Sequence, residues 1–206
     1  MMVEATKIAL SDKELEVVCN TDFIFTKHII IQKVLQLFGN LAATLEDKLK
    51  KEQGCLPEEI FKHRPKISKG ENYLLLPYVM LDYPRCFAKE DTLAIRTFFW
   101  WGNFFSVTLQ LSGSYKSSIA NNIAGSFEYL KQHNYSICIN HSQWEHQFSS
   151  DNYLPVSELT EEEFFAVLNS KSFLKLAKKI PLQSWETVPG FVAKCFEEMM
   201  QWIKTV

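Results

Sequence analysis

The stretch Leu93–Leu111, with the sequence LAIRTFFWWGNFFSVTLQL, decides the fold of this chain. Two runs of β-branched and aromatic residues lie on either side of the dipeptide Gly102-Asn103. Such runs are typical of strands, and glycine accepts the backbone angles that a tight two-residue hairpin loop requires. The stretch therefore predicts a β-hairpin.

The length of the hairpin loop decides which side chains share a face. With a loop of two residues, Trp101 lies opposite Phe104 and Arg96 lies opposite Leu109. One face then carries Ala94, Arg96, Phe98, Trp100, Phe105, Val107, Leu109 and Leu111, and the other carries Ile95, Thr97, Phe99, Trp101, Phe104, Ser106, Thr108 and Gln110. A loop of three residues would shift one strand by one position and exchange its faces.

The composition is that of an ordinary globular protein with a sizeable core. The length of 206 residues predicts a single domain over residues 1–206. Hydrophobic residues make up 47% of the chain, which is enough to form such a core. The formal net charge of −2 argues against nucleic acid as a partner and gives no reason to expect a membrane.

The cysteines indicate a reducing compartment, and the first residues of the chain do not resemble a signal peptide. Five cysteines are widely spread and form no CxxC pair, so we expect free thiols. The first residues contain no basic region followed by an apolar run, and no later run has the ~18 apolar residues of a membrane helix. We therefore expect a soluble, cytoplasmic protein.

Helix signals occupy both ends of the chain. Ser11 and Glu14 have the spacing of a capping box and predict a short helix that ends near Asn20. Apolar residues then recur every three or four positions up to Lys51, which predicts one long helix or two that divide at Gly39-Asn40. After Pro189-Gly190 a further amphipathic pattern predicts a final helix.

The middle of the chain contains strand signals. The segment 73–83 has the composition of a buried strand, and Pro77 within it implies an edge or a bulge. The tetrapeptide Asp82-Tyr83-Pro84-Arg85 resembles a turn, so this strand and the hairpin suggest an antiparallel meander of about three strands. The segment 112–118 predicts a helix start, but it lacks the spacing of a phosphate-binding P-loop.

Shorter elements follow the meander. The segment 135–140 alternates as a short strand, and Thr160 with Glu163 forms a second capping box. We expect the apolar surface of the helix that begins there to continue as far as Pro181. Altogether the order of elements predicts an α+β fold in which a mainly antiparallel sheet, a meander with the aromatic hairpin at 93–111, packs against N- and C-terminal helices.

Histidine and cysteine come closest together in the segment 138–146. Neither strand nor helix spacing directs Cys138, His141 and His146 to one point, so we expect no metal site. A nucleophilic Cys138 or Cys86 would need a neighbouring base, which spacing does not supply. The chain contains no nucleophile elbow, zinc-protease motif or dinucleotide fingerprint, and we expect no cofactor.

Arg96 is the charged residue of greatest interest because the alternation places it on the apolar face of the hairpin. A buried guanidinium must be paired, and Asp82 on the preceding strand is the expected partner. The alternative is that Arg96 lies at the bottom of an aromatic pocket and binds a carboxylate or phosphate with two hydrogen bonds.

On the opposite face, Phe99, Trp101 and Phe104 form an aromatic patch. Helices from either end of the chain would cover this patch, or it would remain exposed and contact a ligand or partner. The basic cluster between Lys62 and Lys69 is diluted by acidic residues and predicts a solvated loop rather than a nucleic-acid site.

Two functions are compatible with these features. The first is an intracellular module that binds an unknown protein partner or a small molecule through its aromatic sheet face. The alternative is a small enzyme, a transferase or hydrolase, with a pocket around Arg96, Asp82, Cys138 and His141. The candidate binding residues are Arg96, Phe99, Trp101, Phe104, Asp82, Tyr83, Arg85 and His141. Self-association into a homo-oligomer is compatible with both functions.

Overall fold

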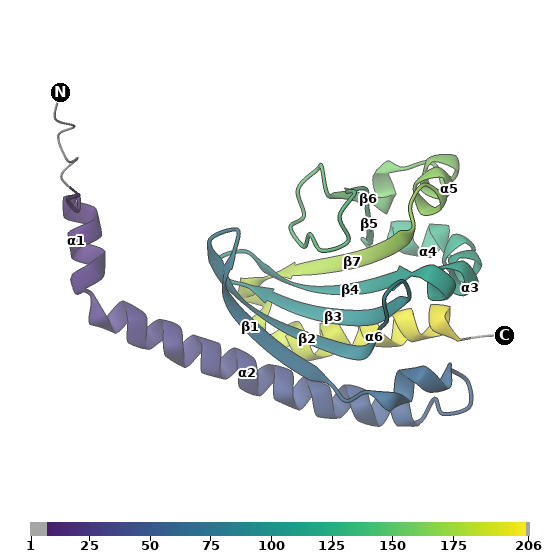
Figure 1. The fold of residues 1–206 in the computed structure, drawn as a ribbon, viewed down its shortest axis with the longest axis horizontal. Coiled ribbons are helices and arrows are strands. Elements are labelled where there is room, and N and C mark those ends of the chain that lie inside the picture. Colours follow the sequence, from purple (N-terminus) through teal and green to yellow (C-terminus); the bar gives the residue numbers. More distant parts are fainter. Residues whose placement is uncertain (1–7, 205–206) are drawn as a thin grey trace.

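A computed structural model describes residues 8–204 and shows an α+β fold built on one antiparallel sheet (Figure 1). The strand order is β1-β2-β3-β4-β7-β5-β6. The strands are β1 (Lys66–Tyr73), β2 (Leu76–Phe87), β3 (Thr92–Trp100), β4 (Phe104–Ser112), β5 (Ser136–Cys138), β6 (Tyr153–Pro155) and β7 (Phe173–Pro181). The predicted fold class is confirmed.

Helices precede, interrupt and follow the strands. The α-helices are α1 (Asp12–Cys19), α2 (Thr21–Lys50), α3 (Gly113–Ala124), α4 (Phe127–Gln132), α5 (Glu161–Asn169) and α6 (Val188–Ile203). Short 3-10 helices are η1 (Glu58–Lys62), η2 (Val156–Glu158) and η3 (Leu182–Thr187). Within residues 8–204, none of these helices combines the length and the apolar character needed to cross a membrane.

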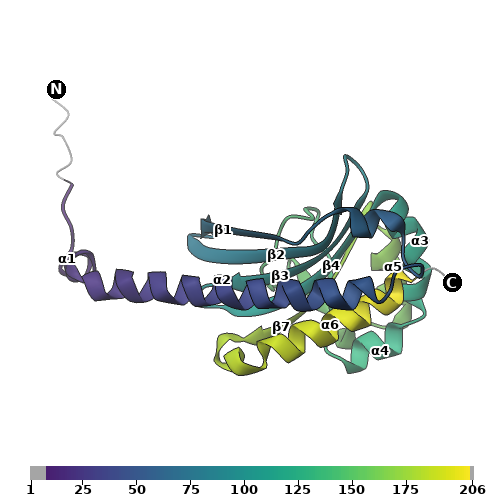
Figure 2. The same ribbon diagram turned by 90° about the horizontal axis from the view of Figure 1, so that it is seen from below.

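Helices α2 and α6 lie side by side against one face of the sheet (Figure 2). Apolar residues of α2 recur every three or four positions and are buried there: Ile31, Val34, Phe38, Leu41, Leu45 and Leu49. Helix α6 buries eight residues against the same face. This interface forms the largest hydrophobic core of the described residues.

The helix signals of the sequence correspond closely to the structure. Both capping boxes form, with Ser11 bonded to Glu14 and Thr160 bonded to Glu163. Helix α2 continues through Gly39 without a break, so the long stretch is one helix rather than two. The predicted final helix is α6, with Pro189 in its first turn.

The hairpin of β3 and β4 is present, but its loop has three residues. Trp100 pairs with Phe104 and Phe99 pairs with Phe105, so Trp101, Gly102 and Asn103 form the loop. Gly102 has a φ of +71°, and the Asn103 side chain donates to the Trp101 carbonyl at 2.8 Å. This extra loop residue contradicts the face assignment for a two-residue loop, because it places Phe105, Val107 and Leu109 on the other face from Arg96.

Three further predictions were wrong. The stretch after Asn169 leaves the helix and forms β7, which pairs with β4 in the middle of the sheet. The basic segment predicted as a loop contains the edge strand β1. The turn predicted at residues 82–85 is a register irregularity inside β2, which continues to Phe87.

The helix start predicted at residues 112–118 is the beginning of α3. Its first turn is already occupied by a carboxylate of the chain, because Asp91 accepts a hydrogen bond from the Ser114 N–H at 2.6 Å. A side-chain carboxylate thus takes the position at which a helix N-terminus would bind an external anion.

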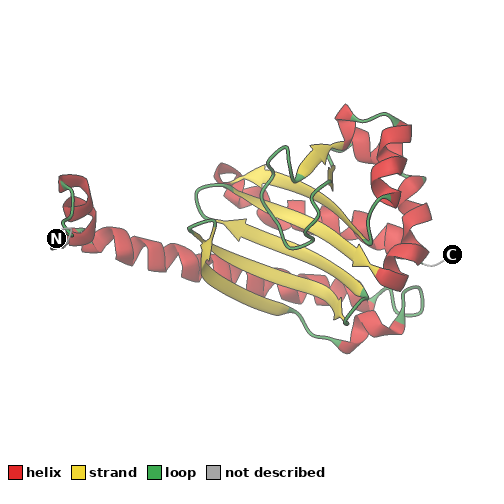
Figure 3. Cartoon of the chain, turned by 45° about the horizontal axis from the view of Figure 1, so that its top comes forward, coloured by secondary structure: helices red, strands yellow, loops and turns green. Residues whose placement is uncertain are grey.

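The other face of the sheet is covered by the segment between β5 and β6, residues 139–152 (Figure 3). This covering loop has no helix or strand of its own. It lies across β3, β4 and β7, and the side chains beneath it are both charged and aromatic.

Candidate functional site

Arg96 and Asp82 form a buried ion pair beneath the covering loop. The two residues are direct partners in the register of β2 and β3, so their side chains project from the same face. Nε of Arg96 donates to Oδ1 of Asp82 at 2.7 Å, and a terminal nitrogen donates to Oδ2 at 3.1 Å. The expected ion pair is therefore confirmed, with the fork geometry in which a guanidinium binds a carboxylate most strongly.

The third nitrogen of Arg96 contacts the covering loop. It lies 3.3 Å from Nε2 of His146, a residue that is 9% exposed. Because a guanidinium can only donate, Nε2 must accept and cannot carry a proton. Burial, together with the positive charges of Arg96 and Lys175, lowers the pKa of His146 to about 2. His146 is therefore neutral when the loop is in place.

Lys175, on β7, is the second cation beneath the loop, and it is completely buried. Its ammonium donates to the main-chain carbonyl of Glu145 and lies 5.3 Å from the centre of the Tyr153 ring. Within residues 8–204 no carboxylate lies within salt-bridge distance of it. Burial lowers the pKa of Lys175 to about 8, which reflects the cost of holding this charge away from water.

The buried polar cluster, defined here as Asp82, Arg96, Gln110, His146 and Lys175, also contains unused hydrogen-bonding capacity. Among the described residues, two buried side-chain atoms lack a hydrogen-bond partner: Oε1 of Gln110 and the hydroxyl of Tyr153. Gln110 uses only its amide nitrogen, which donates to Gln143 of the covering loop at 3.0 Å. Both unpartnered atoms belong to this side of the sheet, where an added polar group would satisfy them.

Tyr73, at the end of β1, holds the covering loop in place. Its phenol oxygen accepts hydrogen bonds from the N–H groups of His146 and Gln147, at 2.6 and 3.1 Å. Its hydroxyl lies within donating distance of the side chains of Gln147 and Glu145. One phenol therefore satisfies several polar groups of a loop that has no regular hydrogen bonding of its own.

An aromatic cluster adjoins the polar cluster on the same face. Phe98, Trp100 and Phe104 are buried there. Phe98 lies 5.1 Å from the His146 ring, and Phe104 lies 5.1 Å from Phe148 of the covering loop, measured between ring centres. Cations and aromatic rings thus share one covered surface.

The structure brings together only some of the predicted site residues. Arg96, Asp82 and Phe104 lie beneath the covering loop. Phe99 is buried on the helix side, where Trp101 packs against the same core, so helices cover these two aromatics. The expectation that Phe99, Trp101 and Phe104 share one face was wrong, because the three-residue loop separates Phe104 from the other two.

The remaining predicted residues lie elsewhere. Tyr83 is buried in the helix-side core. Arg85 is half-buried and donates to the main-chain carbonyl of Arg64 at 2.9 Å. His141 is exposed on the covering loop, whereas Cys138 is buried beneath it and lies 3.5 Å from Oδ1 of Asn152. It is His146, not His141, that the fold brings to Arg96.

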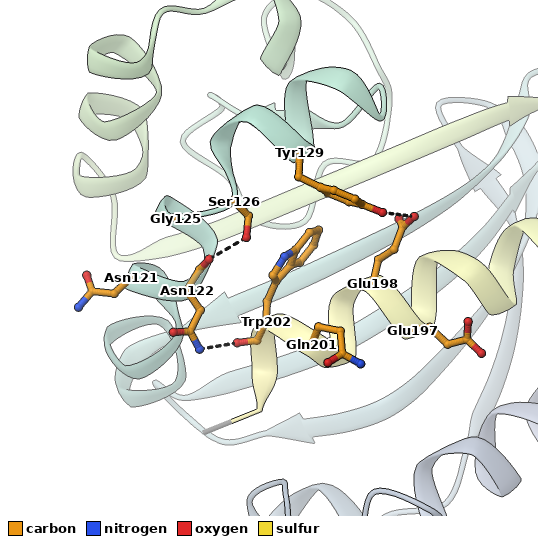
Figure 4. Close-up of a pocket in the computed structure, with 9 residues that line it drawn as sticks. All are labelled: Asn121, Asn122, Gly125, Ser126, Tyr129, Glu197, Glu198, Gln201 and Trp202. Atoms are coloured by element: carbon orange, nitrogen blue, oxygen red, sulfur yellow. Dashed lines mark hydrogen bonds between the residues drawn. The ribbon is translucent and has the colours of Figure 1, made fainter. Parts of the chain in front are cut away.

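A hollow lies between α3, α4 and α6, away from the covered sheet face (Figure 4). It has a volume of about 700 Å³ and is lined by Asn121, Asn122, Gly125, Ser126, Tyr129, Glu197, Glu198, Gln201 and Trp202. Two pairs of its lining residues bind each other: Tyr129 donates to Glu198 at 2.7 Å, and the Asn122 amide donates to the Trp202 carbonyl at 3.0 Å. Neither of the two unpartnered buried atoms lines this hollow. A ligand there would satisfy no buried polar atom that lacks a partner, unlike a ligand on the covered face.

Sequence reasoning missed Lys175 and Tyr73. Lys175 was hidden because its strand resembled the continuation of a helix, and Tyr73 acts on residues more than seventy positions away. No clear alternation marked Lys175, because Phe173 and Ala177 on its own face are apolar, as are Leu174 and Leu176 on the other.

Comparison with known proteins adds no relative: no family model, no curated protein and no solved structure matches the chain. The geometry of the covered sheet face is therefore the basis for inferring a function.

Proposed function

We propose that this protein is an intracellular binding module that takes a small acidic molecule with an aromatic or other apolar portion. The ligand lies on the sheet face beneath the covering loop. Its acidic group pairs with Lys175 and Arg96, and its apolar portion contacts Phe98, Trp100 and Phe104.

The observation that carries this proposal is the buried charge of Lys175, which has no carboxylate within salt-bridge distance among residues 8–204. Burying an ammonium without a counter-ion is costly, and a main-chain carbonyl offsets that cost only in part. The only carboxylate of the buried polar cluster, Asp82, is already bound to Arg96 through two oxygens. A ligand carboxylate that replaced the Glu145 carbonyl would supply the missing negative charge.

The covering loop has to move for this exchange. It is held by Tyr73, by the polar contacts of Gln143, Glu145 and His146, and by the packing of Phe148 on Phe104. All of these contacts belong to one irregular segment, so opening costs less than unfolding of the sheet. The free energy of loop opening is subtracted from the free energy of binding, so the apparent affinity for the ligand is reduced.

The alternative of a small enzyme receives less support. His146 accepts from Arg96, and His141 is exposed, so neither imidazole is hydrogen-bonded to the Cys138 thiol. A thiol nucleophile that is activated by a general base depends on such a hydrogen bond.

A matched pair of fluorescent probes tests the proposal. Anilinonaphthalene sulfonate carries an aromatic body and an anionic group, and phenylnaphthylamine is its uncharged counterpart. We expect the full chain to bind the sulfonate at least about tenfold more tightly, because only the sulfonate pairs with Lys175. Lys175→Met should remove this preference, whereas Lys178→Met, on the same strand but the opposite face, should retain it.

A second variant tests the role of the loop. Tyr73→Phe removes the hydroxyl that holds the loop, so we expect the sulfonate to bind several-fold more tightly than to the original chain. Equal affinities for the two probes in the unmodified chain, or an unchanged preference in Lys175→Met, would contradict the proposal. As a control, each variant should unfold in urea in a single cooperative transition like that of the original chain, which shows that the sheet is intact.

A further inference from the structure

Gln110 and Lys175 stand side by side beneath the covering loop. They are direct partners in the register of β4 and β7, so their side chains project from the same face of the sheet. Gln110 is 1% exposed and Lys175 is completely buried. A ligand acid that pairs with Lys175 therefore has the Gln110 amide as its neighbour.

One end of the Gln110 amide finds no hydrogen-bond partner within residues 8–204. Its nitrogen donates to Gln143 of the covering loop at 3.0 Å, whereas Oε1 is buried and unpartnered. Buried polar atoms without a hydrogen bond are costly and therefore uncommon in native proteins. Because Gln143 belongs to the covering loop, loop opening frees the donor of this amide as well as leaving its acceptor available.

The neighbouring cation determines which chemical group can use this amide. An ammonium group could donate to Oε1, but it would lie close to the ammonium of Lys175 and be repelled by it. A hydroxyl is uncharged and both donates and accepts, so it can satisfy either end of the amide. Charge and hydrogen-bonding capacity together favour a hydroxyl beside the acidic group of the ligand.

The hydroxyl of Tyr153 is the second unpartnered atom on this side of the sheet. The ring of Tyr153 lies 5.3 Å from the Lys175 ammonium. Burial raises the pKa of this phenol far above its usual value, so the hydroxyl keeps its proton and can donate. A carboxylate only accepts and therefore suits Tyr153, whereas the free acceptor of Gln110 needs a group that donates.

We infer that the ligand of the covered sheet face is an α-hydroxy acid with an aromatic or other apolar side chain. Its carboxylate pairs with Lys175, and its hydroxyl donates to Oε1 of Gln110. Because these two residues are direct neighbours across the strands, the hydroxyl belongs on the carbon next to the carboxylate. This inference rests on the proposed function and specifies the class of ligand for the same site.

Three compounds of one shape test the inference by isothermal titration calorimetry with the full chain. Phenylpropionate, phenyllactate and phenylalanine carry a hydrogen, a hydroxyl and an ammonium group, respectively, on the carbon next to the carboxylate. We expect the tighter-binding enantiomer of phenyllactate to bind about fivefold more tightly than phenylpropionate, because it adds one hydrogen bond. Phenylalanine should bind about tenfold more weakly than phenylpropionate, because its ammonium group is repelled by Lys175.

Two variants locate the group that recognises the hydroxyl. Gln110→Met keeps most of the side-chain volume but removes the amide, so it should bind phenyllactate and phenylpropionate equally. Tyr153→Phe is the matched control, which should weaken the binding of both acids by a similar factor and keep the preference for phenyllactate. Each preference is a ratio measured within one variant, so any change in the cost of loop opening cancels. A cooperative urea transition shows that each variant is folded.

The outcomes separate this inference from the proposed function. If phenylpropionate binds as tightly as phenyllactate, or if Gln110→Met keeps the preference for phenyllactate, the inference is overturned and the proposal of an acidic ligand stands. Binding of phenylalanine as tight as that of phenyllactate would overturn it too. If none of the three compounds binds although the sulfonate probe does, the inference alone fails. If the sulfonate preference is absent as well, the proposed function fails with it.

Discussion

Arg96 occupies a strand in which every residue is buried. Its positive charge is therefore stabilised by neighbouring side chains rather than by water. Substitution by methionine keeps most of the side-chain volume but leaves the Asp82 carboxylate without its partner. Removal of one member of a buried pair typically costs ~3–5 kcal/mol, and we expect the unfolding free energy of Arg96→Met to fall by that amount. Urea denaturation measures the change.

The double variant Arg96→Met/Asp82→Leu is the control for this prediction. It removes both charges, so it should recover most of the stability that the single variant loses. A single variant that unfolds at the same urea concentration as the original chain would show that the ion pair contributes little to stability.

At the scale of elements, we expect the closed covering loop to lose stability at low pH because His146 becomes protonated when the loop opens. The pKa of this imidazole is lowered to about 2 when the loop is closed, whereas a free histidine titrates near 6.5. Between these values the open loop binds a proton that the closed loop excludes. The closed state therefore loses stability as the pH falls below about 6.5, by up to ~1.4 kcal/mol per pH unit.

Amide hydrogen exchange of residues 140–150 measures this opening. After correction for the intrinsic pH dependence of exchange, protection of the loop should fall between pH 7 and pH 5, while protection of α6 stays constant. His146→Gln does not titrate and should show the same loop protection at both pH values. Equal pH dependence in the variant and the original chain would rule out His146 as the responsible group.

Elements were predictable from the sequence where their signals are local. Capping boxes and three-and-four spacing predicted α1, α2 and α5 because neighbouring residues determine both features. Strand β7 was misread because Phe173, Leu174, Leu176 and Ala177 are apolar at positions that also fit one side of a helix. A central strand is buried on both faces, so it loses the alternation that reveals an edge.

At the scale of the whole molecule, helix α1 is energetically separate from the rest of the fold. All described residues of α1 are exposed, so the sheet and its helices gain nothing from it within one chain. Deletion of residues 1–19 should therefore leave the unfolding free energy of dilute protein within ~0.5 kcal/mol of the original. Urea denaturation at low concentration checks this, and a loss of several kcal/mol would show that α1 belongs to the folded body.

The sequence by itself determined the α+β class, the two capped helix starts, the helical character of residues 21–50 and the hairpin of β3 and β4, and it favoured the pairing of Arg96 with Asp82. Each of these depends on residues close together in the chain or on adjacent strands. The tertiary structure decided the rest: which aromatics share a face, where Lys175 lies, and how Tyr73 holds residues 145–147. These features depend on a single loop residue and on contacts between distant segments, which local periodicity does not encode.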